Sequence, residues 1–324
     1  MQDKQLFLFL AIKTNASVSG SLQNNYLCIC MTNYYKVAGH EFGVSIPDGN
    51  PLCGQLSQYE PFRIEKGENC IFEVEVVDKV DDPADKEVVY AGPEDPEQPL
   101  VKLYKSGEKW IYEMAVCSGR PLAARMESNA AFTRGRVETL SEKGALFGLN
   151  NALMLMFAFR TAGMNTLEMH ASVIVNGGKA FLWLAASGTG KSTHSKLWLK
   201  HIPGSRLLND DNPIVRIMED GTVEAFGSPW SGKTPCYRNE HYPLGAFTRI
   251  RRASFNKISR LSNFEAYALL YSSSSGFKTD PAMGDALHAT FEQLVMKCPC
   301  YVLDCLPDEE AARVSSAELL SIKD

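Results

Sequence analysis

The sequence predicts an α/β protein in which a smaller β-rich N-terminal domain precedes a C-terminal domain built on a mixed sheet. The chain has 324 residues, which is enough for about two domains. Its first part holds short apolar runs separated by turn residues. After residue 166, strand, glycine-rich loop, helix and strand patterns follow one another. We therefore expect domains at residues 1–140 and 141–324.

The composition is that of a folded protein without a strong charge bias. Its 33 basic and 38 acidic residues are spread without long blocks, so we expect neither nucleic acid nor a membrane surface as a partner. Nine scattered cysteines favour reduced thiols in a cytoplasmic protein, and a homo-oligomer stays an open alternative. The group Cys298, Cys300 and Cys305 is interpreted as core thiols rather than as a metal site.

In the N-terminal part, apolar or alternating runs predict β-strands. The run at residues 6–12 is too short to cross a bilayer and lacks the flanks of a signal peptide, so it predicts a buried first strand. The acidic, proline-rich segment 78–99 predicts a solvated loop. Further strands are expected at residues 26–31, 71–77, 101–104 and 110–116.

The C-terminal domain is predicted element by element. Leucine spacing in residues 143–161 indicates a buried helix at its entrance. A strand at 167–175, the turn Asn176-Gly177 and a strand at 180–185 form a hairpin. A helix at 191–201 follows a glycine-rich loop. Later signals are a turn at Asp220-Gly221, a strand at 244–250, a capping box of Ser262 with Glu265, and a strand at 301–303.

The glycine-rich loop, residues 185–192, matches the phosphate-loop pattern except that Ala185 replaces the first glycine. An apolar strand precedes it and a helix follows it, which is the context that the motif requires. Lys191 would reach the outer phosphates of a nucleotide, and the Ser192 hydroxyl would bind magnesium. The nucleotide site is predicted at Ser187, Gly188, Thr189, Gly190, Lys191, Ser192 and Thr193.

Asp210 and Asp211 come about twenty residues after Lys191, where the next strand would end beside the phosphate loop. Two neighbouring carboxylates can divide the chemistry. We expect Asp210 to take a proton from an attacking hydroxyl and Asp211 to bind magnesium together with Ser192. His170 lies within the apolar strand before the loop, where it is either a core residue or a group that orients the reacting phosphate.

Taken together, residues 169–171, 187–192 and 207–211 resemble the catalytic half of HPr kinase/phosphorylase, within the fold group of phosphoenolpyruvate carboxykinase. The resemblance covers about residues 143–324. It implies a phosphoenolpyruvate carboxykinase-like domain that uses ATP and Mg²⁺. It also implies catalytic roles for His170 and Asp210 and a metal-binding role for Asp211.

The segment 227–234 is similar to one in bacterial relatives of HPr kinase and is expected to be a second active-site loop. Its Lys233 would contact the nucleotide or the phosphoryl group, unless the Ser-Gly-Lys sequence is a surface turn. Arg249, Arg251 and Arg252 either bind an acidic substrate or a phosphate, or protect an exposed edge strand.

The function predicted from these motifs is ATP-dependent phosphoryl transfer to a hydroxyl, for example a serine of a small protein or peptide. One alternative is a carboxykinase that acts on a small carboxylic acid. Another is a regulator that binds a nucleotide without transferring phosphate. The intact pair of Asp210 and Asp211 favours transfer over the regulator.

Overall fold

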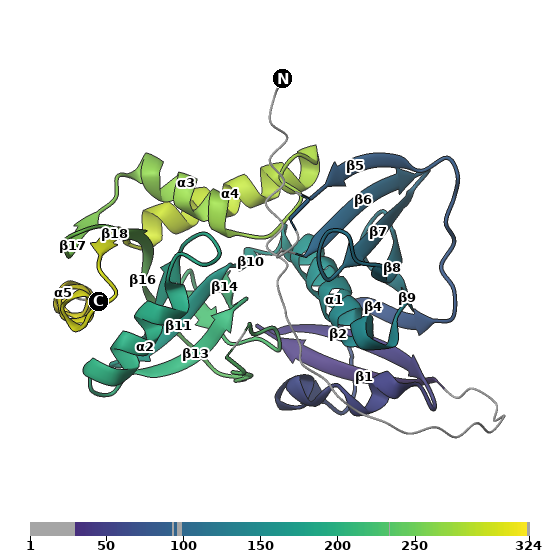
Figure 1. The fold of residues 1–324 in the computed structure, drawn as a ribbon, viewed down its shortest axis with the longest axis horizontal. Coiled ribbons are helices and arrows are strands. Elements are labelled where there is room, and N and C mark those ends of the chain that lie inside the picture. The colour runs from purple at the N-terminus through teal and green to yellow at the C-terminus, as the bar shows by residue number, and fades with distance from the viewer. Residues whose placement is uncertain (1–29, 93, 96–98, 233, 323–324) are drawn as a thin grey trace. The chain divides into compact units, whose positions relative to one another are not determined.

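The computed structural model describes residues 30–92, 94–95, 99–232 and 234–322 (Figure 1). Its contacts divide the chain into two compact units, of which one ends at Arg160 and the other begins at Thr161. Both units contain mixed sheets together with helices, which confirms the predicted α/β class. The strand expected at residues 6–12 and most of the run 26–31 lie outside the described residues.

The N-terminal unit is built on one nine-stranded sheet. Its strands are β1 (Cys30–Val37), β2 (His40–Pro47), β3 (Arg63–Ile64), β4 (Cys70–Val77), β5 (Glu87–Ala91), β6 (Leu100–Ser106), β7 (Lys109–Ala115), β8 (Leu122–Asn129) and β9 (Arg134–Thr139). The spatial order is β3-β1-β2-β4-β9-β8-β7-β6-β5. β4 is parallel to both of its neighbours, and the other pairs are antiparallel. Short 3-10 helices span Pro51–Gly54, Ser57–Phe62 and Glu142–Gly144.

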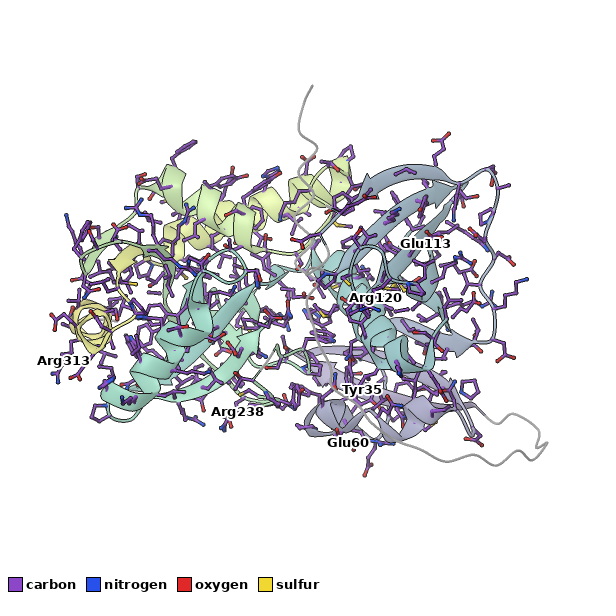
Figure 2. All side chains as sticks on the ribbon, in the orientation of Figure 1. Tyr35, Glu60, Glu113, Arg120, Arg238 and Arg313 are labelled. Carbon is purple, nitrogen blue, oxygen red and sulfur yellow. The ribbon has the colours of Figure 1, made fainter. Side chains whose placement is uncertain are left out.

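Strand β5 corrects part of the expectation of a solvated loop at residues 78–99, whereas residues 78–86 lie outside the helices and strands and are mostly exposed. It pairs with β6 at the edge of the sheet. The register of this pairing shifts at a bulge between Val88 and Tyr90. Charged side chains next to it are neutralised by one another. Glu113, labelled in Figure 2, lies 2.8 Å from Lys86 and 3.1 Å from Arg125. These ion pairs lower the pKa of Glu113 although burial raises it, so the carboxyl stays ionised.

Helix α1 (Ala145–Thr161) belongs to the N-terminal unit. Phe157 packs edge-on against Phe42 of β2, and the Asn150 side-chain oxygen accepts hydrogen bonds from Gln58 at 3.0 Å and Tyr59 at 2.8 Å. The sequence predicted the helix but assigned it to the second domain. The two units therefore divide after Arg160 rather than after Leu140.

The second unit contains a second mixed sheet, of order β10-β14-β15-β16-β12-β11-β13, to which β18 adds beside β16 and β17 beside β18. Its strands are β10 (Thr166–Glu168), β11 (Ala171–Asn176), β12 (Lys179–Leu184), β13 (Arg206–Asp211), β14 (Ile214–Ile217), β15 (Val223–Phe226), β16 (His241–Arg252), β17 (Lys257–Arg260) and β18 (Cys300–Cys305). Its helices are α2 (Lys191–His201), α3 (Asn263–Ser273), α4 (Pro281–Lys297) and α5 (Glu309–Leu319).

Most local predictions for this unit are confirmed. β11 and β12 form the hairpin, whose turn uses Gly177 and Gly178 at φ 58° and 79°, a conformation that glycine adopts at low cost. The capping box at Ser262 is present. The predicted strand 167–175 is instead two strands, because the chain leaves the pairing with β14 after Glu168 and joins β12 and β13 only from Ala171.

One hydrophobic cluster joins the sheet to α2 and α5. Trp183 of β12 lies against Trp198 of α2, with ring centroids 5.3 Å apart, and Ala311 of α5 completes the packing. In Figure 1, α3 and α4 lie on the other side of β16 and β18 from α2. This packing fixes the direction of α2 relative to the strand that feeds it. No helix in the described part of the chain is long and apolar enough to cross a membrane.

Candidate active site

Strand pairing brings three segments to one edge of the second sheet. Ala171, the first residue of β11, lies opposite Leu184, the last residue of β12, and also opposite Asp211, the last residue of β13. His170 therefore stands next to both the start of the glycine-rich loop and the acidic pair. The carboxyl ends of parallel strands are where α/β proteins bind their ligands. The motifs singled out in the sequence thus meet at the expected edge.

The loop between β12 and α2 has the backbone of a tight anion-binding turn. Gly188 and Gly190 have φ angles of 74° and 133°, which residues other than glycine rarely adopt. The Thr189 amide donates to the Ala186 carbonyl across the loop at 3.2 Å. Because α2 begins at Lys191, its positive N-terminal end faces the same space. The side chains of Ser187, Ser192 and Thr193 are exposed there.

Lys191 is buried and held at the base of the loop. Its ammonium lies 3.0 Å from the Ala185 carbonyl oxygen and 2.9 Å from Nε2 of His170. Burial lowers the pKa of Lys191, while the carboxylates of Asp211 and Asp210 act in the opposite direction. An anion in the loop would therefore interact with the Lys191 ammonium, which is already held in position.

The structure places Ser192 beside Asp210. The Ser192 hydroxyl donates a hydrogen bond of 2.9 Å to Oδ1 of Asp210, which is buried. The sequence had paired Ser192 with Asp211 instead. A hydroxyl and a carboxylate at this distance are both hard oxygen donors, the type that Mg²⁺ takes, and Mg²⁺ completes its shell with phosphate oxygens and water.

Asp211 turns instead to His170, whose Nε2 lies 3.3 Å from its Oδ1. The same nitrogen faces Lys191. Depending on the tautomer, it either donates a hydrogen bond to the Asp211 carboxylate or accepts a hydrogen bond from the Lys191 ammonium. Asp211 has φ 149°, an unusual value for a residue with a side chain. Strain of this kind clusters at functional sites.

The segment beginning at Gly227 lies against the acidic pair. Asn209 donates to Ser228 Oγ at 3.1 Å and to the Trp230 carbonyl at 3.2 Å. The Gly232 amide then donates to the Asp210 carbonyl at 2.6 Å. A Cβ at Gly232 would lie 3.1 Å from that oxygen, which is a tight contact. Lys233, which the sequence assigned to the nucleotide, lies outside the described residues.

Sequence reasoning missed Glu168. This carboxyl group is fully buried, and one of its oxygens accepts a hydrogen bond of 3.2 Å from Ser275. Burial raises its pKa to about 8, and the charge of Asp211 adds to the rise. Glu168 is thus a neutral acid beside the site at neutral pH. Its position two residues before His170 was the only signal in the sequence.

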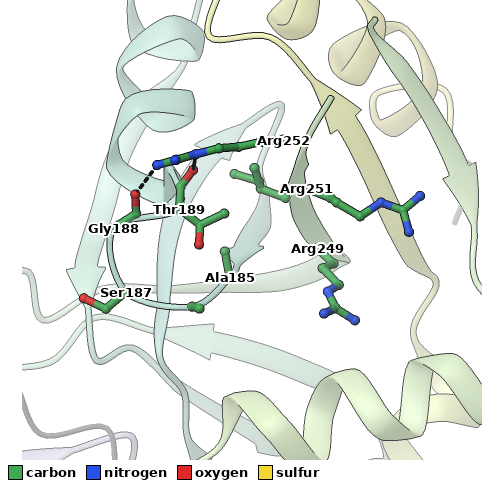
Figure 3. Close-up of a pocket in the computed structure, with 9 residues that line it drawn as sticks. Ala185, Ser187, Gly188, Thr189, Arg249, Arg251 and Arg252 are labelled. Carbon is green, nitrogen blue, oxygen red and sulfur yellow. Dashed lines mark hydrogen bonds between the residues drawn. The ribbon is translucent and has the colours of Figure 1, made fainter. Parts of the chain in front are cut away.

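Two cavities flank the loop on its β16 side, away from the acidic pair. One, of about 350 Å³, lies between residues 185–189 and the arginines of β16 (Figure 3). The other, of about 390 Å³, opens beside α2 and is largely apolar. Its lining includes Thr193, Leu197, Ile250, Ala253, Cys305, Leu306 and Pro307.

Two further observations bear on the identity of the site. In the described part of the chain, no group of three or more His, Cys, Asp or Glu side chains is arranged to hold a metal ion. A magnesium site that relies on Ser192, one carboxylate and a nucleotide does not need such a group.

No family model matches the sequence, and neither does any curated protein.

Proposed function

We propose that the chain is an ATP-dependent phosphotransferase that moves a phosphoryl group to a hydroxyl. The observation that carries the proposal is the contact between Ser192 and Asp210 at the start of α2, next to Lys191 and His170. A phosphate loop, a hydroxyl paired with an acid, and a second acid beside a histidine are the parts that phosphoryl transfer needs. The resemblance to HPr kinase and to the phosphoenolpyruvate carboxykinase fold group supports the same reaction.

We assign the two aspartates in the reverse of the order that the sequence suggested. Asp210 and Ser192 would hold Mg²⁺, which neutralises charge on the phosphates when it is bound with the nucleotide. Asp211 would take the proton of the acceptor hydroxyl, because it faces His170 rather than Ser192. Lys191 would neutralise the outer phosphates, and His170 would keep Asp211 oriented.

The largely apolar cavity beside α2 supports a nucleotide rather than a bare polyphosphate as the ligand. β12 has β11 and then β13 on one side, and β16 and then β18 on the other. A nucleotide whose outer phosphate faces Asp210 would therefore direct its base toward Leu197, Ile250 and the residues after β18. Apolar walls of this kind suit the faces of a purine base.

The first test is nucleotide-dependent thermal stabilisation. A ligand at one hundred times its dissociation constant stabilises a protein by about 2.7 kcal/mol. Magnesium with ATP should raise the melting temperature of the wild type, and Lys191→Ala should abolish the shift because the main charge partner of the phosphates is lost. A wild-type protein that responds to none of ATP, ADP, GTP and pyrophosphate would rule out the phosphate-loop interpretation.

Measurements of ATP turnover distinguish a kinase from a regulatory protein and from a carboxykinase. Slow hydrolysis of ATP by water, or transfer once an acceptor is found, supports the kinase. Nucleotide binding without any turnover would instead favour a regulatory protein. Transfer that depends on a small carboxylic acid would favour a carboxykinase.

A further inference from the structure

Three arginines near the end of β16 have different environments. Strand pairing places Arg249 beside Leu184, directly before the phosphate loop. Arg251 forms a bidentate ion pair with Asp304 of β18. Arg252 turns toward the loop itself, where its guanidinium donates to the Gly188 carbonyl at 2.6 Å and to the Thr189 carbonyl at 3.1 Å (Figure 3).

The contacts of Arg252 fix two peptide planes of the loop. In a trans peptide the C=O and the N–H point in opposite directions. Holding the carbonyls of Gly188 and Thr189 on the outer side therefore turns the amides of Thr189 and Gly190 toward the inside. The Thr189 amide points across the loop to the Ala186 carbonyl, as this geometry requires. Because the Thr189 amide is already bonded within the loop, the amide that this arrangement turns toward an anion is that of Gly190.

Arg252 also differs from Arg251 in its ion pairing. Arg251 is neutralised by Asp304, whereas no carboxylate in the described ranges forms an ion pair with Arg252. Its side chain is exposed and lines both cavities beside the loop. A forked guanidinium suits this position because it can bond two carbonyl oxygens at once, which a lysine ammonium on a flexible stem does less well.

We propose that Arg252 is a positioning residue that holds the phosphate loop in its anion-binding conformation from the outside. The inference rests on the proposed function only in that residues 185–192 bind phosphate groups. Arg252 acts on the bound phosphate groups through the loop backbone, so it should favour them equally in the ground state and in the transition state. Its loss should therefore weaken binding and leave the turnover of bound ATP unchanged.

The test measures the affinity for inorganic pyrophosphate, which has no base, by calorimetry with Mg²⁺ present. Arg252→Ala should weaken binding about tenfold, the scale of losing a charged hydrogen-bonding group. Arg252→Lys should restore part of the loss, because the ammonium can still reach one carbonyl. The matched control is Arg251→Ala on the same strand, which should leave pyrophosphate affinity unchanged because Arg251 is engaged by Asp304.

Two further readouts separate positioning from a purely structural role. Amide hydrogen exchange in Arg252→Ala should speed up at residues 188–190 while the melting temperature of the ligand-free protein stays the same. The kcat for ATP hydrolysis at saturating ATP should stay within about threefold of the wild type.

A large fall in kcat with unchanged pyrophosphate affinity would overturn the inference, since Arg252 would then contact the transferring phosphoryl group. Unchanged values of both would also overturn it. If the wild type binds neither pyrophosphate nor nucleotide, the proposed function itself fails, which is a different result from either of these.

Discussion

The neighbouring carboxylates of Asp210 and Asp211 both reach the space around Lys191 because the backbone at Asp211 is unusual. Consecutive side chains of a regular strand point to opposite faces. The φ of 149° at Asp211 departs from strand geometry, and both carboxylates come close enough to Lys191 to act on its pKa. Non-glycine strain of this type costs about 1–3 kcal/mol. The hydrogen bond from the Gly232 amide to the Asp210 carbonyl helps to offset it.

The different partners predict different losses. Asp210→Asn should weaken magnesium-dependent nucleotide binding, because an amide cannot match a carboxylate at Mg²⁺. Asp211→Asn should leave that binding nearly intact and lower phosphoryl transfer by about a hundredfold or more, the scale of losing a general base. MgADP affinity and ATP turnover measure the two effects. Asp285→Asn, at an exposed site on α4, is the control. The opposite pattern would restore the assignment that the sequence suggested.

Glu168 predicts a pH dependence of stability. Its pKa is about 8 in the folded protein, against an ordinary value of 4.5, so the folded state keeps a proton that the unfolded state releases. The free energy of unfolding should therefore fall as pH rises from about 4.5 to 8, by about 1.4 kcal/mol per pH unit from this group. Below about pH 4.5 the contribution of Glu168 to the free energy of unfolding is fully present.

Glu168→Gln removes that slope, because glutamine mimics the neutral acid. The variant should match the wild type near pH 4.5 and become increasingly more stable than it toward pH 8. Urea unfolding at pH 5, 6.5 and 8 compares the two chains, and the other titrating groups cancel in the difference. Parallel curves for the two proteins would show that Glu168 is ionised in the native state.

At the level of elements, the sequence was sufficient where local chemistry decides the structure. The strand, loop and helix at residues 180–201 follow from glycine placement and apolar spacing, and the structure has them as expected. The division of the strand at His170 was not predictable, because it depends on pairing with β13 and β14, which come later in the chain. The burial of Glu168 likewise depends on Ser275, 107 residues away.

Helix α2 also depends on a distant element. Ser315 of α5 accepts a hydrogen bond from Trp198 at 2.9 Å and contacts Nε2 of His194 at 3.1 Å. Burial lowers the pKa of His194 to about 3, so its ring is neutral. These contacts hold the helix whose first turn carries Lys191 and Ser192. The sequence indicated the helix but not its anchor, because a single serine on α5 has no distinctive pattern.

At the level of the whole molecule, the boundary between the two units decides which residues are needed for the site. α1 lies in the N-terminal unit, where Leu149, Leu153 and Phe157 are fully buried. The sequence could not assign the helix to a domain, because an apolar pattern predicts burial without naming the partner surface. The residues that carry the proposed chemistry all follow Thr161, from His170 to Arg252.

We therefore predict that a fragment of residues 161–324 folds alone and binds pyrophosphate within about threefold of the affinity of the full chain. A fragment of residues 141–324 should aggregate, because it carries α1 without its sheet and exposing each large apolar side chain costs about 1.5–3 kcal/mol. Circular dichroism, size-exclusion chromatography and calorimetry on both fragments test this. A folded fragment 161–324 that binds no pyrophosphate would mean that the N-terminal unit completes the site. A shorter fragment that fails to fold while the longer one folds would contradict the boundary at Arg160.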